Sequence, residues 1–235
     1  MDFELDPLGY AICDFASNGF SENITVMADL CEDDVMPVEY LFRTEEMMPE
    51  LEKKALSLCK GKILDVGAAA GCHSYLLHKQ GKDVHAIDSS HGAVLHLKSL
   101  GLNAEQTDFF DLKGQYDTVL ILMNGIGIAG NLDNLSRFLK QIKALLSPGG
   151  TALCDSTDLS YMYQEEDGSM WLELNGSYLG EMQFKMQYKE VESNWFRWLY
   201  IDFDLLKEYA NKEGLNCELI LEGPSNNYLV SLTHQ

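Results

Sequence analysis

Strand-like runs and segments of helical spacing alternate through the middle of the chain. The strand-like runs cover residues 63–66, 82–88, 103–107, 116–123 and 151–154. Helical patterns lie between them at residues 74–79, 92–100 and 131–146. The run 116–123 is apolar almost throughout, which is typical of a parallel strand that is buried on both faces. The alternation predicts an α/β fold with a parallel sheet and right-handed crossovers.

The pattern changes after residue 155. Residues 181–188 alternate apolar and polar side chains, as a half-exposed strand does, and residues 195–201 can return beside them after a polar turn. We therefore expect an antiparallel hairpin, inserted at about residues 160–201 and packed near the mouth of a site.

The chain closes with a helix and two further strands. Asp202 can cap the helix at 203–211, and strands are expected at 216–221 and 227–232. Because the turn between the two strands is short, they must be antiparallel. The predicted sheet thus has seven strands and is mostly parallel, with an antiparallel last strand.

The first sixty residues predict a helical cap. Apolar residues at helical spacing, followed by Asn18 and Gly19, indicate one helix, and a second is expected between Pro49 and Gly61. The short aromatic segment 37–43 could cover a ligand. We expect residues 1–60 to form this cap and residues 61–235 to form the main domain.

The chain of 235 residues carries a net charge of −20, which disfavours nucleic acid as a partner. The first fifty residues contain thirteen Asp or Glu residues and one basic residue, Arg43. This segment is either a solvated acidic face or a region that favours a cationic substrate. The scattered cysteines, the lack of a long apolar run and the acidic start predict a cytoplasmic protein without membrane contact. No ligand pattern indicates a metal.

Residues 63–74 combine a strand, a turn of small residues and the start of a helix. In an open α/β sheet, ligands bind at such a strand end. A dinucleotide fingerprint that starts at Gly67 would need glycines where Ala69 and Cys72 stand, so the spacing argues against it.

The sequence Asp65-x-Gly67-x-Ala69-x-Gly71 resembles the first motif of class I S-adenosylmethionine (SAM)-dependent methyltransferases, although Ala69 departs from its glycine pattern. Asp88, Asp108 and a glycine-rich loop at 123–130 follow in the family's order. The chain is also similar to uncharacterised bacterial members that carry Leu-Phe-Arg before this motif and Met-Asn-Gly-Ile-Gly in that loop. The resemblance implies a Rossmann-like class I methyltransferase fold with SAM as cofactor.

The resemblance also implies roles for individual residues. Asp88 would accept hydrogen bonds from both ribose hydroxyls, with Ser89 beside it; otherwise it caps a helix. Asp108 would accept from the adenine amino group, with Phe109 against the ring; otherwise it caps a turn. Asp65 would lie near the amino group of the methionine part of SAM. The full expected set is Arg43, Asp65, Gly67, Ala69, Gly71, Asp88, Ser89, Asp108, Phe109, Met123, Asn124 and Gly125.

Arg43 could bind the carboxylate of SAM, as a basic residue ahead of the first motif does in the family. The alternative is a salt bridge to Glu39, Glu46 or another acid.

Methyl transfer from a sulfonium needs alignment of the reactants, and it needs a base only if the acceptor must lose a proton first. Asn124 is a candidate for orienting the substrate, and His73 and Asp155 are candidates for a base. Further candidates near strand ends are His91, Asp158, Tyr161 and Tyr163.

The sequence therefore predicts methyl transfer from SAM to a small molecule, leaving S-adenosylhomocysteine (SAH). Aromatic residues such as Tyr163, Trp171 and Trp195 could line a pocket for a flat acceptor or an amine cation, or they could form the apolar face of the hairpin. A protein methyltransferase, a SAM-binding module without turnover and a nicotinamide oxidoreductase are the alternatives. The acceptor and the oligomeric state are not predicted.

Overall fold

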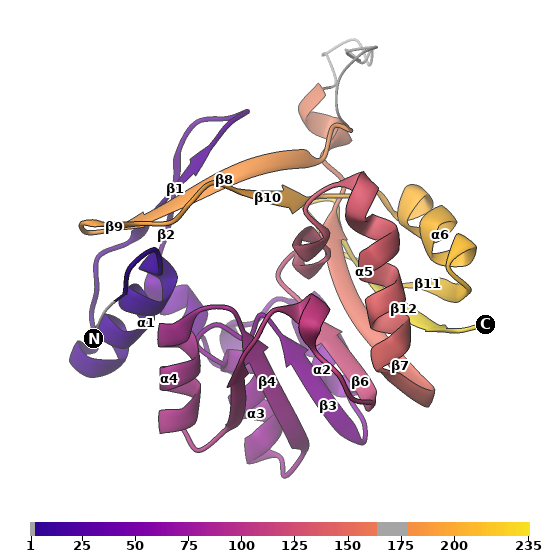
Figure 1. The fold of residues 1–235 in the computed structure, drawn as a ribbon, viewed down its shortest axis with the longest axis horizontal. Coiled ribbons are helices and arrows are strands. Elements are labelled where there is room, and N and C mark those ends of the chain that lie inside the picture. Colours follow the sequence, from indigo (N-terminus) through magenta and orange to yellow (C-terminus); the bar gives the residue numbers. More distant parts are fainter. Residues whose placement is uncertain (1–2, 164–177) are drawn as a thin grey trace.

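The computed structural model describes residues 3–163 and 178–235, which form two β-sheets and the helices around them (Figure 1). The larger sheet has seven strands in the order β11-β12-β7-β6-β3-β4-β5. Its bounds are β3 Lys62–Val66, β4 Asp83–Asp88, β5 Asn103–Gln106, β6 Tyr116–Ile121, β7 Leu146–Thr157, β11 Leu215–Glu222 and β12 Asn227–His234.

Strands β3 to β7 pair in parallel, and β12 pairs antiparallel with both β7 and β11. This confirms the predicted seven-stranded, mostly parallel sheet. The order places β3, β4 and β6 side by side, so their carboxyl ends meet at one edge.

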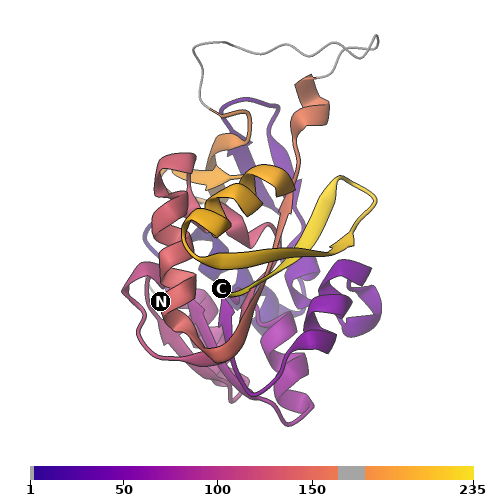
Figure 2. The same cartoon turned by 90° about the vertical axis from the view of Figure 1, so that its right-hand side faces the viewer.

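Helices cover both faces of this sheet (Figures 1 and 2). They are α2 Glu50–Leu58, α3 Cys72–Lys79, α4 His91–Ser99, α5 Leu132–Leu145 and α6 Phe203–Lys212. Ile63 packs with α2 and α3, whereas the next residue, Leu64, packs with α5 and α6. Successive side chains of a strand point to opposite faces, so the two helix pairs lie on opposite sides.

Side chains cap the starts of helices α5 and α6, and the cap expected at Asp202 is confirmed. The side chain of Asn131 accepts a hydrogen bond from the Asn134 amide at 3.0 Å, at the start of α5. The side chain of Asp202 accepts from the Leu205 amide at 2.9 Å, at the start of α6. Each cap satisfies an amide that has no partner within its helix.

A second, antiparallel sheet has the order β10-β8-β1-β2, with β9 paired to β8. Its bounds are β1 Ile24–Ala28, β2 Asp34–Met36, β8 Glu181–Tyr188, β9 Val191–Glu192 and β10 Phe196–Leu199. Strands β8 and β10 form the expected hairpin, with Phe184 opposite Phe196. Figure 1 shows this sheet spanning the space between α1 and α5, above the seven-stranded sheet.

The helical cap expected over residues 1–60 also contains strands that the sequence analysis did not predict. Residues 1–60 do contain α1 Pro7–Asn18, η1 Val38–Phe42, η2 Glu45–Met47 and α2, but they also contain β1 and β2. Strand β1 pairs with β8, and Thr25 lies opposite Gln187. The sequence reading missed these strands because they are short and their partner is distant in the chain. The domain boundary at residue 60 stays a prediction.

Helix α1 joins the two sheets. Gly9 of α1 packs against Gly92 of α4 so closely that a Cβ on Gly92 would lie 2.4 Å from the Gly9 carbonyl oxygen. Asp14, also on α1, accepts a hydrogen bond at 2.6 Å from the hydroxyl of Tyr188, a fully buried residue of β8. The second sheet is thereby fixed to the seven-stranded sheet through α1.

Candidate active site

The turn after β3 contains three residues in the left-handed region: Gly67 (φ 69°), Ala69 (φ 48°) and Gly71 (φ 83°). The amides of Gly67 and Ala68 donate to the Ile87 carbonyl oxygen at 2.9 and 3.1 Å, which ties the turn to β4. Gly67 is exposed, and the space where its Cβ would stand is open to 4 Å. This position leaves the backbone accessible to a ligand.

The other two positions of the motif serve packing. A Cβ on Gly71 would lie 2.5 Å from the end of the Leu97 side chain of α4, so a larger residue would require that leucine to shift. Ala69 adopts a conformation that costs a non-glycine residue roughly 1–2 kcal/mol. Its methyl group packs in an apolar cluster with Ile12 and Met123, and this contact offsets part of the strain.

Asp88 ends β4 directly beside this turn. Its Oδ2 accepts from the Ala69 amide at 2.8 Å, and its Oδ1 accepts from the Ser90 amide at 2.8 Å. Burial raises its pKa to about 6, although the two amides oppose the shift. The cap of α4 is Ser90 and not Asp88. Each oxygen of Asp88 keeps a lone pair for a ligand.

The residues expected around the adenine lie along the same edge. Ser89 is exposed, and its carbonyl oxygen accepts from Gln106 at 3.1 Å. Asp108 is also exposed, and its Oδ1 accepts a hydrogen bond from the Phe110 amide at 2.7 Å. Asp108 therefore caps a turn, as the alternative expected, and its Oδ2 can still accept a hydrogen bond from a ligand. Phe109 is buried and packs against Phe138.

Asp65 is buried beneath the start of α3. It accepts a hydrogen bond from the Ser74 hydroxyl at 2.6 Å, and burial raises its pKa. Its carboxyl group is thus part of the local packing between β3 and α3.

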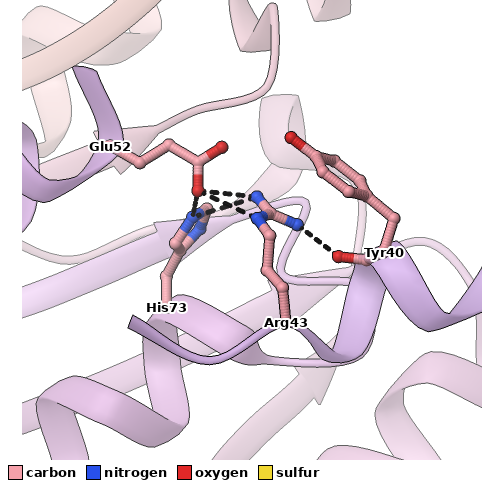
Figure 3. Close-up of polar contacts among 4 residues, drawn as sticks. All are labelled: Tyr40, Arg43, Glu52 and His73. Atoms are coloured by element: carbon pink, nitrogen blue, oxygen red, sulfur yellow. Dashed lines mark hydrogen bonds and ion pairs between the residues drawn. The ribbon is translucent and has the colours of Figure 1, made fainter. Parts of the chain in front are cut away.

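Arg43 forms a salt bridge with Glu52 of α2 (Figure 3). This is the alternative to SAM binding that the sequence analysis left open for Arg43. One oxygen of Glu52, Oε2, accepts from Arg43 Nη2 at 2.7 Å, from Arg43 Nε at 3.2 Å and from His73 Nε2 at 2.8 Å. Figure 3 shows the second oxygen of Glu52 pointing away from both cations. The Tyr40 ring covers the guanidinium at 4.2 Å, and its carbonyl oxygen accepts from Nη1 at 2.7 Å.

The charge state of His73 follows from these contacts. Burial lowers its pKa, but hydrogen bonds with Cys72 and Glu52 outweigh burial and raise the pKa to about 10. His73 is therefore an imidazolium at neutral pH and cannot act as a base. The Arg43–Glu52–His73 group carries a net charge of +1 within a protein of net charge −20.

The sequence analysis missed Glu52. It lies next to Leu51 and three residues before Ala55, both on the buried face of α2. A glutamate at the margin of an apolar helix stripe is a signal for a buried ion pair, but its partners cannot be read from the helix alone.

The loop after β6 is strained and held in place by β7. Met123 (φ 66°) and Asn124 (φ 56°) are consecutive left-handed residues, which is uncommon outside functional sites. The Asp155 Oδ1 accepts from the Gly125 amide at 3.2 Å, and the Thr157 hydroxyl donates to Asn124 Oδ1 at 2.7 Å. The side-chain oxygen of Asn124 is thus held by Thr157, which fixes the orientation of its side chain within the loop.

Asp155 is buried at the same edge of the sheet as the group around Glu52. Burial raises its pKa to about 6, against hydrogen bonds from the Asn124 and Gly125 amides, and it is electrostatically coupled to Glu52 and His73. The structure thus brings together the motif turn, Asp88, the cationic group and the loop after β6.

A cavity of about 630 Å³ lies between the second sheet and the loop after β6. Five methionines line it: Met36, Met123, Met162, Met182 and Met186. Five aromatic side chains also line it: Tyr161, Phe184, Phe196, Trp198 and Tyr200. Its volume suits a small organic molecule.

The remaining candidates lie apart from this arrangement. His91 is exposed and bonded to Gln106. Asp158 accepts from the Ser160 amide at 2.8 Å and does not line the cavity. The Trp195 side chain is half-exposed and does not line the cavity, whereas the Trp198 side chain does. Trp171 and the Tyr163 side chain lie outside the described residues.

In residues 3–163 and 178–235, no group of three or more His, Cys, Asp or Glu side chains is arranged to hold a metal ion. The helices described there include none that is both long enough and apolar enough to cross a bilayer.

Residues 39–211 match the family described as methyltransferase domain. A SAM-dependent methyltransferase from Bacteroides fragilis, crystallised with SAH, is 43% identical over 100% of this chain and 97% of that chain, with a TM-score of 0.93. The CcbJ methyltransferase from Streptomyces caelestis shares the fold at 16% identity, over 82% of this chain and 99% of that chain, with a TM-score of 0.60.

A further match is the cypemycin N-terminal methyltransferase from Streptomyces sp. It is 32% identical over 102 residues, which are 41% of this chain and 42% of that protein. The matched region thus spans less than half the length of this relative.

Proposed function

This chain belongs to the class I SAM-dependent methyltransferases, and from that premise we propose that it transfers the methyl group of SAM to a small-molecule acceptor, leaving SAH. One observation carries the proposal. The cavity and the motif turn are connected through two methionines, because Met36 and Met123 both line the cavity and pack in the same apolar cluster as Ala69 and Ala70.

The residues at the sheet edge fit SAM. The open space at Gly67 admits a ligand against the backbone, and Asp88 has a free lone pair on each oxygen for the two ribose hydroxyls. We assign Asp108 and Phe109 to the adenine. The cationic Arg43–Glu52–His73 group suits the carboxylate of the methionine part.

Arg43 does not meet that carboxylate in its present position, because its side chain is fully buried under the Tyr40 ring. Tyr40 is 40% exposed and lies on the short helix η1. We infer that Arg43 acts by holding Glu52 and, through it, His73.

Bound SAM supplies an electrophilic methyl group on a sulfonium, which departs as a neutral thioether. The protein's contribution is to position the acceptor and to exclude water, and proximity and orientation can lower a barrier by roughly 7–11 kcal/mol. The loop after β6 would orient the acceptor through the side-chain amide of Asn124.

Asp155 is the candidate base that the structure leaves. Because its pKa is raised to about 6, it is ionised at neutral pH and still basic enough to take a proton. Its contact with the Gly125 amide gives it a second role, which is to fix the loop. His73 is set aside, since it is already protonated.

The proposal is tested by calorimetric titration of ligand-free protein with SAM, SAH and NAD, followed by methyl transfer from labelled SAM to panels of small molecules and peptides. We expect binding of both adenosyl ligands, no response to NAD, and label in a small molecule. Label in peptides alone would favour the protein-methylating alternative. SAM that binds but is never consumed would favour a binding module without turnover.

A further inference from the structure

We propose that the acceptor is an amine with an apolar or aromatic body, and that it binds in the cavity beneath the second sheet. This inference rests on the proposed function, since it names the substrate class of the same site. Three observations support it: the apolar and aromatic side chains that line the cavity, the acidic residues among them, and the position of Met123 between the cavity and the motif turn.

The lining is suited to an apolar body. Most of its side chains are methionines and aromatic rings. They come from β2, β8 and β10 of the second sheet, from Tyr200 just after β10, from the loop after β6 and from the short helix η5 Ser160–Tyr163. Methionine is flexible and polarisable, so it adapts to ligands of irregular shape. A sugar or another highly hydroxylated molecule would leave its polar groups without partners among these side chains.

The charge at the cavity selects a cation. Among the described residues that line it, two are charged, and both are acidic: Glu32, between β1 and β2, and Asp34, at the start of β2. None of these described lining residues is Lys or Arg. A carboxylate or a phosphate would meet two like charges and the field of a protein with net charge −20. An ammonium group is attracted by these acids and by the faces of rings such as Trp198.

The position of the cavity connects this binding to methyl transfer. Met123 lines the cavity, and the loop that carries it packs against the second sheet because Gly127 leaves room for the Trp198 ring. A Cβ on Gly127 would lie 2.0 Å from the Trp198 Nε1. The cavity is therefore fixed against the edge where SAM binds.

The chemistry of an amine acceptor balances without a further reactant. The ammonium loses one proton, for which Asp155 is the candidate base. The lone pair of nitrogen then forms the new N–C bond while the methyl–sulfur bond breaks and sulfur keeps that electron pair. The product is a methylated ammonium.

The test is titration of the protein saturated with SAH, using amines and carboxylates of matched body: tryptamine against indole-3-propionate, phenethylamine against 3-phenylpropionate, and hexylamine against heptanoate. We expect each amine to bind about tenfold tighter than its matched acid, because like charges oppose the acid. Equal affinity within the pairs, or no binding of any amine while SAH binds, would overturn the inference and leave the proposed function standing. Failure to bind SAH would refute the proposed function itself.

Two double variants separate local from global charge. Glu32→Gln with Asp34→Asn should weaken amine binding by about threefold to tenfold and leave SAH binding unchanged. The control is Glu45→Gln with Glu46→Gln, which removes two negative charges from exposed residues that are also among the first fifty but do not line the cavity. This control should leave amine binding unchanged. Equal losses from both pairs would contradict a local role for Glu32 and Asp34.

Cys31 gives a measurement that needs no substitution. Its thiol is exposed and lines the cavity, whereas Cys13 is half-buried and does not. Tryptamine should slow alkylation of Cys31 by N-ethylmaleimide and leave the rate at Cys13 unchanged, as followed by peptide mass spectrometry. Unchanged labelling of Cys31 at saturating tryptamine would place the amine elsewhere and overturn the proposal.

Discussion

At the scale of single residues, one carboxylate oxygen holds two cations together. Glu52 Oε2 accepts from both Arg43 and His73, and all three side chains are buried. An ion pair of this kind contributes little net stability, but removal of one partner leaves an uncompensated buried charge. The position of His73 beneath the motif turn thus depends on Glu52.

We predict that Glu52→Gln lowers the free energy of unfolding by about 3–5 kcal/mol at pH 7 and returns the His73 pKa towards its ordinary value. In the wild type the His73 pKa is about 10 instead of 6.5. The stabilisation that the protonated imidazole gives the folded state is therefore fully present below pH 6.5 and is lost as pH rises through 10. Urea unfolding and NMR titration of the imidazole measure the two effects.

Glu50→Gln is the matched control for this change. Glu50 lies on the same helix, and its side chain is 82% exposed in a surface pair with Lys53. Its replacement should change stability by less than about 1 kcal/mol. A loss as large as that of Glu52→Gln would show that the buried pairing is not the cause.

We expect the proposed SAM site to depend most on Asp88. We predict that Asp88→Ala weakens SAM binding by about 1.5–3 kcal/mol, because a charged double acceptor is lost. Asp83→Ala, at the exposed start of the same strand, should bind SAM as the wild type does. Calorimetry measures both, and unchanged affinity of Asp88→Ala would show that the ribose lies elsewhere.

At the scale of elements, β7 positions the loop after β6. Two consecutive left-handed residues, Met123 and Asn124, persist because Asp155 and Thr157 bond to the loop from the neighbouring strand. The strand end therefore serves two purposes, to shape the loop and to hold a buried carboxylate beside it.

The buried charge of Asp155 leads to a pH-dependent prediction. Its pKa is about 6 in the folded state against an ordinary 3.8. The protonated carboxyl group therefore contributes stability that is fully present below pH 3.8 and is lost as pH rises through 6. We expect Asp155→Asn to be more stable than the wild type at pH 7, with a smaller difference at pH 4. Thermal unfolding at the two pH values measures this, and a constant difference would contradict the burial of a charge.

At the scale of the whole molecule, α1 connects the two sheets through glycine contacts with α4 and through Tyr188 of β8. The second sheet contributes most of the cavity, and the seven-stranded sheet contributes the motif turn. The relative position of the two sheets thus decides whether an acceptor and SAM can meet.

We predict that Gly92→Ala destabilises the protein by about 1–3 kcal/mol through overpacking, although alanine is the better helix former. Hydrogen exchange should accelerate in α1 and the second sheet and stay unchanged in β3 and β6. Ser99→Ala, at the exposed end of the same helix, is the control that improves helix propensity without contact to α1. Uniform acceleration in both sheets would show that α1 is not the connection.

The sequence by itself determined the seven-stranded sheet and the strand-end positions of Asp65, Asp88 and Asn124. Those features follow from local signals, since the period of apolar residues sets helix or strand and glycines mark the turns. The parallel order then places several strand ends at one edge.

Only the tertiary structure decided the pairing of β1 with β8, the group formed by Arg43, Glu52 and His73, and the cavity that Met123 shares with the motif turn. Each of these joins residues from elements that are separate in the chain. Local periodicity carries no information on such partners, because they are selected by how the elements pack and not by their own sequence patterns. The Thr25–Gln187 pairing, across more than a hundred residues, exists only once the chain has folded.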